Sequence, residues 1–169
     1  LLGLAGASLM IVINMPGESY RGPFQPLSAE EERIRDRLRA HVEVLADRIG
    51  ERNLWRYPAL QEAAAYIEDS WRDLGYRLER QEYDAAGKAV RNIAVELHGT
   101  LYADEIVVIG AHYDSVPGSP AANDNGSGVA ALLELARLLR GAALPRSVRF
   151  VAFVNEEAPF YYTQQMGSR

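Results

Sequence analysis

The fold of this chain is constrained most by two apolar segments with the length and composition of buried β-strands. Residues 106–111 form a continuous, largely β-branched block, and residues 148–154 have a similar character. Such runs, with little polar alternation, are expected of parallel strands that are covered on both faces of a sheet. Between them, residues 129–139 repeat apolar side chains at helical spacing, and Gly141 and Pro145 follow. The order predicts a strand–helix–strand unit.

Residue types suited to metal binding follow both predicted strands. His112 opens the loop after the first strand, and Asp124 precedes the helix. Glu156 and Glu157 come directly after the second strand. Because ligands collect outside the carboxyl ends of parallel strands, we expect these side chains to meet at one edge of the sheet. Imidazole and carboxylates suit Zn2+, with Mn2+ or Co2+ as alternatives, and the chain has no cysteine for a thiolate site.

The spacing within these motifs indicates that the site residues have different roles. Asp114 lies two residues after His112, so in extended backbone it points to the same side and can accept the second imidazole N–H. Glu156 and Glu157 are neighbours at a strand end and should face different directions. One can therefore bind a metal while the other handles a proton, although spacing alone does not decide which.

Each of these residues also has an ordinary structural interpretation. A histidine at a strand end is commonly a surface residue, Asp124 could cap a helix, and paired glutamates are usually solvated. Their coincidence at one sheet edge favours the metal. Ser115 and Ser127 do not lie in the Gly-x-Ser-x-Gly turn of a serine hydrolase, and the glycine loop lacks the lysine of a phosphate-binding loop. His41 and His98 are interpreted as structural.

Three motifs in this order closely resemble a known enzyme family. They are His112-Tyr113-Asp114-Ser115, then Ala122-Asn123-Asp124-Asn125-Gly126-Ser127-Gly128, then Asn155-Glu156-Glu157. The family is metallopeptidase family 28, the two-zinc aminopeptidases, whose relatives include glutamate carboxypeptidase II and the glutaminyl cyclases. The resemblance covers about residues 40–169, and Arg52-Asn53 adds only a weak motif. The family resemblance implies an α/β fold, a three-layer αβα sandwich with a mostly parallel central sheet.

The resemblance also implies a role for each site residue. His112 would bind one zinc ion, Asp124 would bridge two, and Glu157 would bind the other. Glu156 would be the general base, and Asp114 would orient His112. The implied reaction is an exopeptidase reaction, in which a metal-activated water hydrolyses the bond after a free amino-terminal residue of a peptide.

The chain departs from the family pattern after the two glutamates. Members of the family carry a further Asp ligand and a final His ligand there, and residues 158–169 contain no Asp, Glu or His. We therefore expect the amino-terminal part of a zinc peptidase domain, truncated at its carboxyl end. Such a fragment should be inactive when taken alone.

Two other functions are compatible with the motifs. A glutaminyl cyclase-like acyltransferase shares closely similar motifs but works with one zinc, so metal stoichiometry and release of a free amino acid separate the two activities. A non-catalytic receptor or membrane module on the same fold is expected to lose ligands. His112, Asp124, Glu156 and Glu157 are all present here.

Composition narrows the class of protein further. The chain has 169 residues, of which 48% are apolar and 24% charged, with a formal net charge of −5. This length is enough for one core, and the charge argues against a nucleic-acid partner, which would favour a basic stripe. Composition makes no prediction about oligomeric state.

The amino-terminal residues predict export. Leu1–Ile13 is uncharged and almost wholly apolar, although shorter than the roughly 20 residues that span a bilayer. We assign residues 1–15 to a membrane anchor or a signal-peptide remnant, residues 16–27 to a Pro/Gly linker and residues 28–169 to the peptidase domain. The domain should then lie outside the cytoplasm, either membrane-anchored or secreted or periplasmic.

Four more elements are predicted before the strand–helix–strand unit. Ser28 and Glu31 form a capping box for a helix that ends at Gly50. A second helix should run from about Pro58 to Gly75. Two strands, near residues 76–83 and 89–97, should follow around a turn at residues 84–88.

Overall fold

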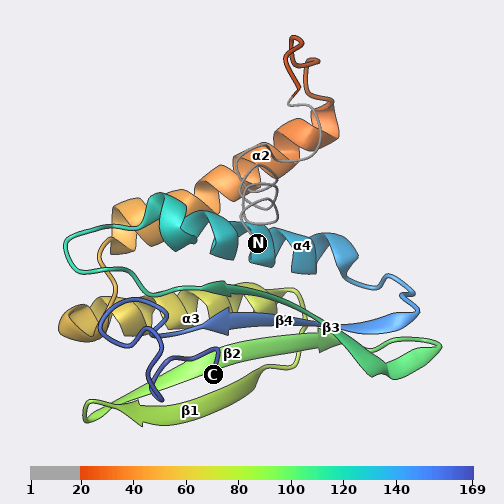
Figure 1. Cartoon of the computed structure of the whole chain (residues 1–169). Helices are drawn as coiled ribbons and strands as arrows, with labels where there is room; N and C mark the ends of the chain where they lie inside the picture. The colour runs from red at the N-terminus through yellow and green to blue at the C-terminus, as the bar shows by residue number, and fades with distance from the viewer. Residues whose placement is uncertain (1–19) are drawn as a thin grey trace, which may run out of the picture.

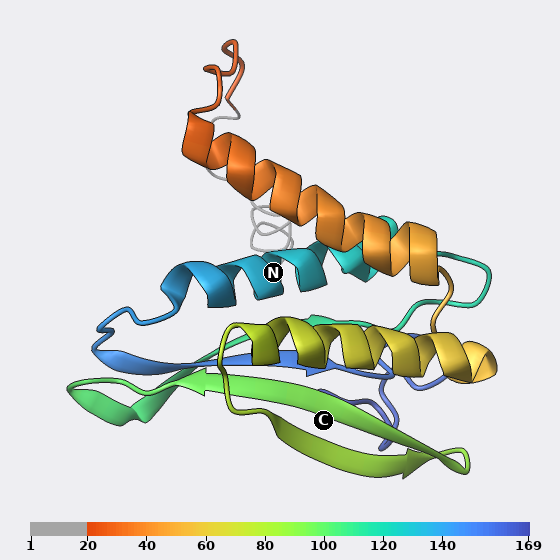
Figure 2. The same ribbon diagram turned by 180° about the vertical axis from the view of Figure 1, so that it is seen from behind.

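A computed structural model describes residues 20–169 (Figures 1 and 2). The predicted apolar segment 1–15 and the first part of the linker 16–27 therefore lie outside the described residues. The elements are α2 (Ala29–Val42), η1 (Glu43–Ile49), η2 (Leu54–Arg56), α3 (Tyr57–Asp73), β1 (Glu79–Ala85), β2 (Lys88–Leu97), β3 (Tyr102–His112), η3 (Ala122–Ser127), α4 (Gly128–Leu139) and β4 (Arg146–Phe153). None of the described helices is long and apolar enough to cross a membrane.

The predicted strand–helix–strand unit is confirmed. β3 and β4 are parallel neighbours, paired continuously from Ile106 opposite Ser147 to His112 opposite Phe153. Helix α4 connects them and packs against both strands. Because the two strands run in the same direction and end together, the residues that follow them meet at one edge of the sheet.

The sheet is mixed, with the strand order β1-β2-β4-β3. β1 and β2 form an antiparallel hairpin, β2 and β4 are also antiparallel, and among the described strands only β3 and β4 are parallel. The hairpin turn explains the first reversal, because Ala86 and Gly87 both have positive φ, of 50° and 77°, which suits a two-residue connection. The α/β class is confirmed, whereas "mostly parallel" does not describe this part of the sheet.

The helices lie on one side of the sheet, as both views show (Figures 1 and 2). α3 and α4 contact the sheet and each other, and α2 packs on α4. The opposite side carries the segment after β4, which runs across the front in Figure 1. Of the three layers expected, the described residues therefore supply the sheet and one helical layer, because all three long helices precede or connect strands from the same side.

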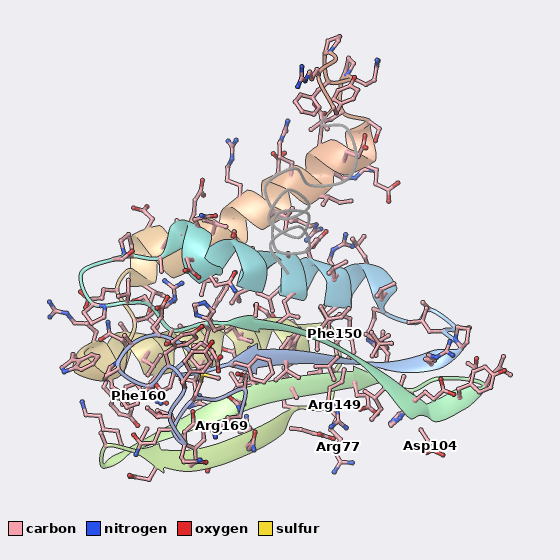
Figure 3. All side chains as sticks on the ribbon, viewed as in Figure 1. Arg77, Asp104, Arg149, Phe150, Phe160 and Arg169 are labelled. Carbon is pink, nitrogen blue, oxygen red and sulfur yellow. The ribbon has the colours of Figure 1, made fainter. Side chains whose placement is uncertain are left out.

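The hydrophobic core lies between the sheet and this helical layer. The inward side chains of α3 and α4 are fully or almost fully buried, and Phe150 of β4 faces them (Figure 3). The main helical contributors are Leu60, Ala64, Ile67, Trp71, Val129, Leu132, Leu133 and Ala136. Burying such side chains contributes about 1.5–3 kcal/mol for each large aliphatic one. This core fixes α4 against β3 and β4, and so fixes the loop before α4.

The expectation that the first apolar strand is covered on both faces is wrong for the described residues. Ile106, Val107 and Val108 are 44%, 46% and 57% exposed. The reason is topological, since β3 is the outer strand of the described sheet and only β4 pairs with it. The sequence pattern predicts an apolar strand, but how far its side chains are buried depends on the position of the strand in the sheet.

Both amino-terminal helices form as predicted. The Ser28 hydroxyl accepts the Glu31 N–H at 3.3 Å, and the Glu31 carboxylate accepts the Ser28 N–H at 2.7 Å, which is the predicted capping box. Helix α2 continues through the π-helical turn η1 and stops at Gly50, and α3 is followed by Gly75. Both glycines have φ of 77°, which explains why the helices end there.

Candidate metal centre

Three chain segments converge at the carboxyl ends of β3 and β4. His112 is the last residue of β3 and pairs with Phe153 near the end of β4. Asp124 lies in η3, immediately before α4. Glu156 and Glu157 follow β4 in a segment that includes Phe160, which lies at this end of the sheet (Figure 3).

His112, Asp124 and Glu157 come together as the sequence pattern predicted. Each offers one ligand atom, and these atoms all lie within 4.8 Å of one another. His112 Nε2 and Asp124 Oδ1 are 2.9 Å apart. In a tetrahedral zinc site with bonds of about 2.0–2.2 Å, ligand atoms lie roughly 3–4 Å apart, so the cluster is close to that spacing. The donor set, one imidazole and two carboxylates, fits Zn2+.

Asp114 is a buried support beneath this cluster. Its side chain is 4% exposed, Oδ1 accepts the backbone N–H of Glu156 and Oδ2 accepts that of Glu157, both at 3.1 Å. His112 Nδ1 is 3.2 Å from the Asp114 carbonyl oxygen and 3.5 Å from Oδ1. A proton on Nδ1 directed at Asp114 leaves the Nε2 lone pair free for a metal. Asp114 thus links the strand end that carries His112 to the one that carries the glutamates.

Glu156 and Glu157 point to different partners, as neighbours at a strand end should. Glu157 joins His112 and Asp124. The Glu156 carboxylate accepts two hydrogen bonds from Ser168, from its N–H at 2.6 Å and its hydroxyl at 2.8 Å. Ser168 was not predicted, because a serine twelve residues after Glu156 belongs to no sequence pattern that marks such a contact.

The charges of the cluster act on one another. Burial lowers the pKa of His112, but the hydrogen bonds and charges of Asp114 and Asp124 outweigh it and raise the pKa to about 9. Burial raises the pKa of Glu157, and the negative charges of Asp124 and Asp114 add to this effect. Crowded carboxylates of this kind gain most from a cation placed among them.

The cluster lines an open cavity of about 430 Å³. Its wall consists of His112, Asp124, Glu156, Glu157, Ala158 and Tyr161. Glu156 therefore faces the same space as the three candidate ligands while making its own contacts to Ser168. This arrangement places a carboxylate outside the ligand cluster but beside it, where it can exchange a proton with a molecule held in the cavity.

The remaining predicted residues do not form a second site. Ser115 is fully buried, and the Ser127 hydroxyl donates to the Asn123 carbonyl oxygen. His41 Nδ1 of α2 lies 2.6 Å from the Tyr66 hydroxyl of α3, and His98 is exposed beside Glu96. The partly buried contact of His41 agrees with a structural role, and that role for His98 stays a prediction.

The buried arginine Arg52 was undervalued by sequence reasoning. It is fully buried and its side chain contacts the loops that carry His112 and Asp124. Arg52-Asn53 is a weak motif, and an arginine between a glycine and a helix start would ordinarily be solvated. Only the tertiary structure shows where its guanidinium lies.

Sequence comparisons connect this site with peptidases. Residues 92–168 match Peptidase family M28. The uncharacterized protein YfbL of Escherichia coli (strain K12) is 35% identical over 142 residues, covering 79% of this chain and 43% of that protein. Aminopeptidase YwaD of Bacillus subtilis (strain 168) is 55% identical over 53 residues, covering 31% of this chain and 12% of that protein. The probable lipoprotein aminopeptidase LpqL of Mycobacterium tuberculosis is 51% identical over 53 residues, covering 31% of this chain and 11% of that protein.

Solved structures share the fold. BSAP, a zinc aminopeptidase from Bacillus subtilis, superposes with a TM-score of 0.64 at 18% identity, over 72% of this chain and 61% of that one. Tannerella forsythia glutaminyl cyclase superposes with a TM-score of 0.59 at 22% identity, over 78% of this chain and 52% of that one. The aligned part of this chain thus spans less than two thirds of the length of each of these proteins.

Proposed function

Because this chain belongs to peptidase family M28, we propose that it carries part of the active site of a zinc-dependent aminopeptidase. The observation that carries the proposal is the convergence of His112, Asp124 and Glu157 in one cavity with Glu156 beside them. Aminopeptidases among the sequence relatives support a peptide substrate with a free amino terminus.

The contacts of each side chain support the roles that the family resemblance implies. His112 Nε2 and one carboxylate oxygen of Glu157 would each serve as a metal ligand, and Asp124, with two oxygens, would be shared between two ions. When bound, the metal polarises the substrate carbonyl and lowers the pKa of water in the cavity. Asp114 holds the His112 ring and the backbone of both glutamates in place.

Glu156 is the proposed general base. Its carboxylate faces the cavity and is fixed by Ser168 rather than by the ligand cluster. It would take a proton from the attacking water and return it to the leaving amine, a transfer that typically contributes 10²–10⁴-fold to rate. This step requires a carboxylate that is not itself a metal ligand.

Location outside the cytoplasm is proposed on two grounds. Residues 1–15 are predicted to form an anchor or signal-peptide remnant, and one relative is a probable lipoprotein aminopeptidase. Both agree with a domain that acts on extracellular or periplasmic peptides.

The test uses the purified full-length protein with zinc, cobalt or no added metal. Bound metal is counted by elemental analysis, and the release of free amino acid from an amino-acid anilide is compared with ring closure of a glutaminyl peptide. Metal-dependent release of amino acid supports the proposal. Ring closure with one bound ion would instead assign the cyclase activity, and metal-free protein without either activity would contradict both.

A further inference from the structure

Arg52 makes an unusual set of contacts for a charged side chain. It is fully buried, and its guanidinium donates five hydrogen bonds, all to backbone carbonyl oxygens. Nε donates to Tyr113 at 2.6 Å; Nη1 donates to Leu45 and Gly50, both at 3.1 Å, and to Pro120 at 2.6 Å; Nη2 donates to Ala121 at 3.1 Å. All three nitrogens of the planar fork therefore donate; Nη1 has two hydrogens for its three acceptors, so one of its N–H groups is shared between two carbonyl oxygens.

These carbonyl groups belong to three separate parts of the chain. Tyr113 lies between His112 and Asp114, so one bond holds the end of β3. Pro120 and Ala121 immediately precede η3, which carries Asp124. The remaining two carbonyls are those of Leu45, within η1, and Gly50, which follows η1.

Arg52 attaches the loop before Asp124 to the end of β3 and to η1. The guanidinium accounts for the described hydrogen bonds from Pro120 and Ala121 to other elements; the remaining ones are local, from the Gly126 N–H to the Ala121 carbonyl oxygen and from the Ala121 N–H to Ser119 Oγ. The main chain of Arg52 adds a second link, to the loop that follows β3. The Arg52 N–H donates to Ser115 Oγ at 3.0 Å, and the Ser115 N–H donates to the Arg52 carbonyl oxygen at 2.9 Å.

Burial of this cation carries a cost that the contacts must offset. Burial lowers the pKa of Arg52 to about 10, so the side chain remains charged at neutral pH. Removing a cation from water costs several kcal/mol, and here five hydrogen bonds to carbonyl oxygens offset that cost, with the negative charge of Asp114 adding to them. Lysine has only three donors on one nitrogen and cannot reach three segments at once.

We propose that Arg52 is a positioning residue that sets the separation of His112 and Asp124, and through it the geometry of the metal cluster. The inference rests on the proposed metal-binding function. His112 and Asp124 lie on different segments with Nε2 and Oδ1 2.9 Å apart, and Arg52 bonds the chain next to His112 and three residues before Asp124. A tilt of either segment would separate ligands that must bind one ion.

The test measures Zn2+ affinity of the full-length protein by competition with a chromophoric chelator, for the wild type, Arg52→Lys and the matched control Arg91→Lys. Arg91 is also largely buried, but its side chain bonds Glu68 and Gln61, away from the cluster. Affinity is measured well below the melting temperature of each variant. Arg52→Lys should lose about 10–100-fold in affinity, as loss of an outer partner of a metal ligand does, and Arg91→Lys should stay within about threefold of the wild type.

A second readout separates positioning from general stability. Saturating Co2+ should give an altered visible spectrum in Arg52→Lys and the wild-type spectrum in Arg91→Lys, because the spectrum reports ligand geometry. Should Arg52→Lys fail to fold, Ser115→Ala removes the acceptor of the Arg52 N–H and should weaken Zn2+ binding by about 3–10-fold, the effect of one lost hydrogen bond.

The outcomes distinguish the two proposals. Unchanged Zn2+ affinity and Co2+ spectrum in the Arg52 variant, or in Ser115→Ala where that variant replaces it, would overturn the positioning role while the metal site stands. Equal losses in Arg91→Lys would overturn it as well, since affinity would then follow stability. A wild type that binds no Zn2+ would reject the metal site itself, and the role of Arg52 with it.

Discussion

The side chain of Asp114 holds the backbone of Glu157: the Asp114 carboxylate accepts the Glu157 N–H at 3.1 Å. The other oxygen of the same carboxylate accepts the Glu156 N–H. A carboxylate that receives two successive main-chain N–H groups fixes the direction in which both following side chains leave the backbone. The orientation of the two glutamates is thus set by a buried residue in the loop that follows the neighbouring strand β3.

Asp114→Asn should weaken metal binding. Asparagine keeps one acceptor oxygen but turns an amide NH2 toward the second N–H, so one of the two backbone bonds is lost and the His112 ring loses its negative neighbour. We expect Zn2+ affinity to fall about 10–100-fold. The measurement is chelator competition, with the exposed Asp104→Asn as the control. Equal affinities for both variants would show that Asp114 does not support the cluster.

Glu156→Gln and Glu157→Gln should have different effects. Glu156→Gln removes proton transfer and keeps side-chain shape, so metal content should stay near that of the wild type while kcat falls about 10²–10⁴-fold. Glu157→Gln should lower the metal content. Elemental analysis and steady-state kinetics measure both, and the exposed Glu62→Gln is the control. The opposite pattern would mean that the two roles are exchanged.

Ser168→Ala should impair turnover without removing metal. The variant deletes the hydroxyl that donates to Glu156 at 2.8 Å but keeps the N–H bond at 2.6 Å. Loss of one hydrogen bond to a charged group, worth roughly 1.5–3 kcal/mol when fully formed, should lower kcat by about 3–30-fold in this open site, with KM changed little. Ser168→Thr retains the hydroxyl and should restore most of the rate. A wild-type kcat in Ser168→Ala would show that the Ser168 hydroxyl does not contribute to catalysis.

Glu68 should make folding stability depend on pH. Hydrogen bonds from Arg80, together with those from Arg91, outweigh burial and lower the pKa of Glu68 from its ordinary 4.5 to about 2. A carboxyl whose pKa is lower in the folded state stabilises it above the unfolded pKa, and this contribution is lost as pH falls through the folded pKa. The wild type should therefore lose roughly 1–3 kcal/mol more of its unfolding free energy between pH 5 and pH 2 than Glu68→Gln does.

Urea unfolding at several pH values in this interval measures the difference. Glu82→Gln, at an exposed position of β1, is the control. Parallel pH profiles for the wild type and Glu68→Gln would contradict the prediction.

The apolar amino-terminal residues should determine where the protein resides. Deleting residues 1–15 should leave folding unchanged and move the protein from the membrane fraction to the soluble one, because no further apolar run of that kind is present. Fractionation of the full-length gene product, with determination of the mature amino terminus, is the measurement. Recovery in the cytoplasm with the segment intact would contradict export.

Local patterns predicted most of the elements and the composition of the site. Helix caps at Ser28, Gly50 and Gly75, and the positions of β3, α4 and β4, follow from short-range rules that the structure bears out. His112, Asp124 and Glu157 could be grouped because parallel strands end at one edge. Their proposed roles are still predictions.

Long-range contacts could not be predicted in the same way. The burial of Arg52 and the bond from Ser168 to Glu156 depend on how distant segments meet, and neither residue stands out from its neighbours in type or spacing. The exposure of Val107 and Val108 depends on which strand lies at the margin of the sheet, and a local pattern carries no information about that. The spacing of apolar residues predicts whether a segment is a helix or a strand. Which other segments it packs against is decided only when the whole chain folds.

The outward edge of β3 has a practical consequence for work with this chain in isolation. Its backbone N–H and C=O groups on that side have no partner strand among the described residues, and the adjacent Ile106, Val107 and Val108 are half exposed. A long, apolar, unprotected strand edge is a template for strand addition between molecules. Purified on its own, the chain should self-associate as its concentration rises, and a charged residue placed at Val108 should improve its solubility.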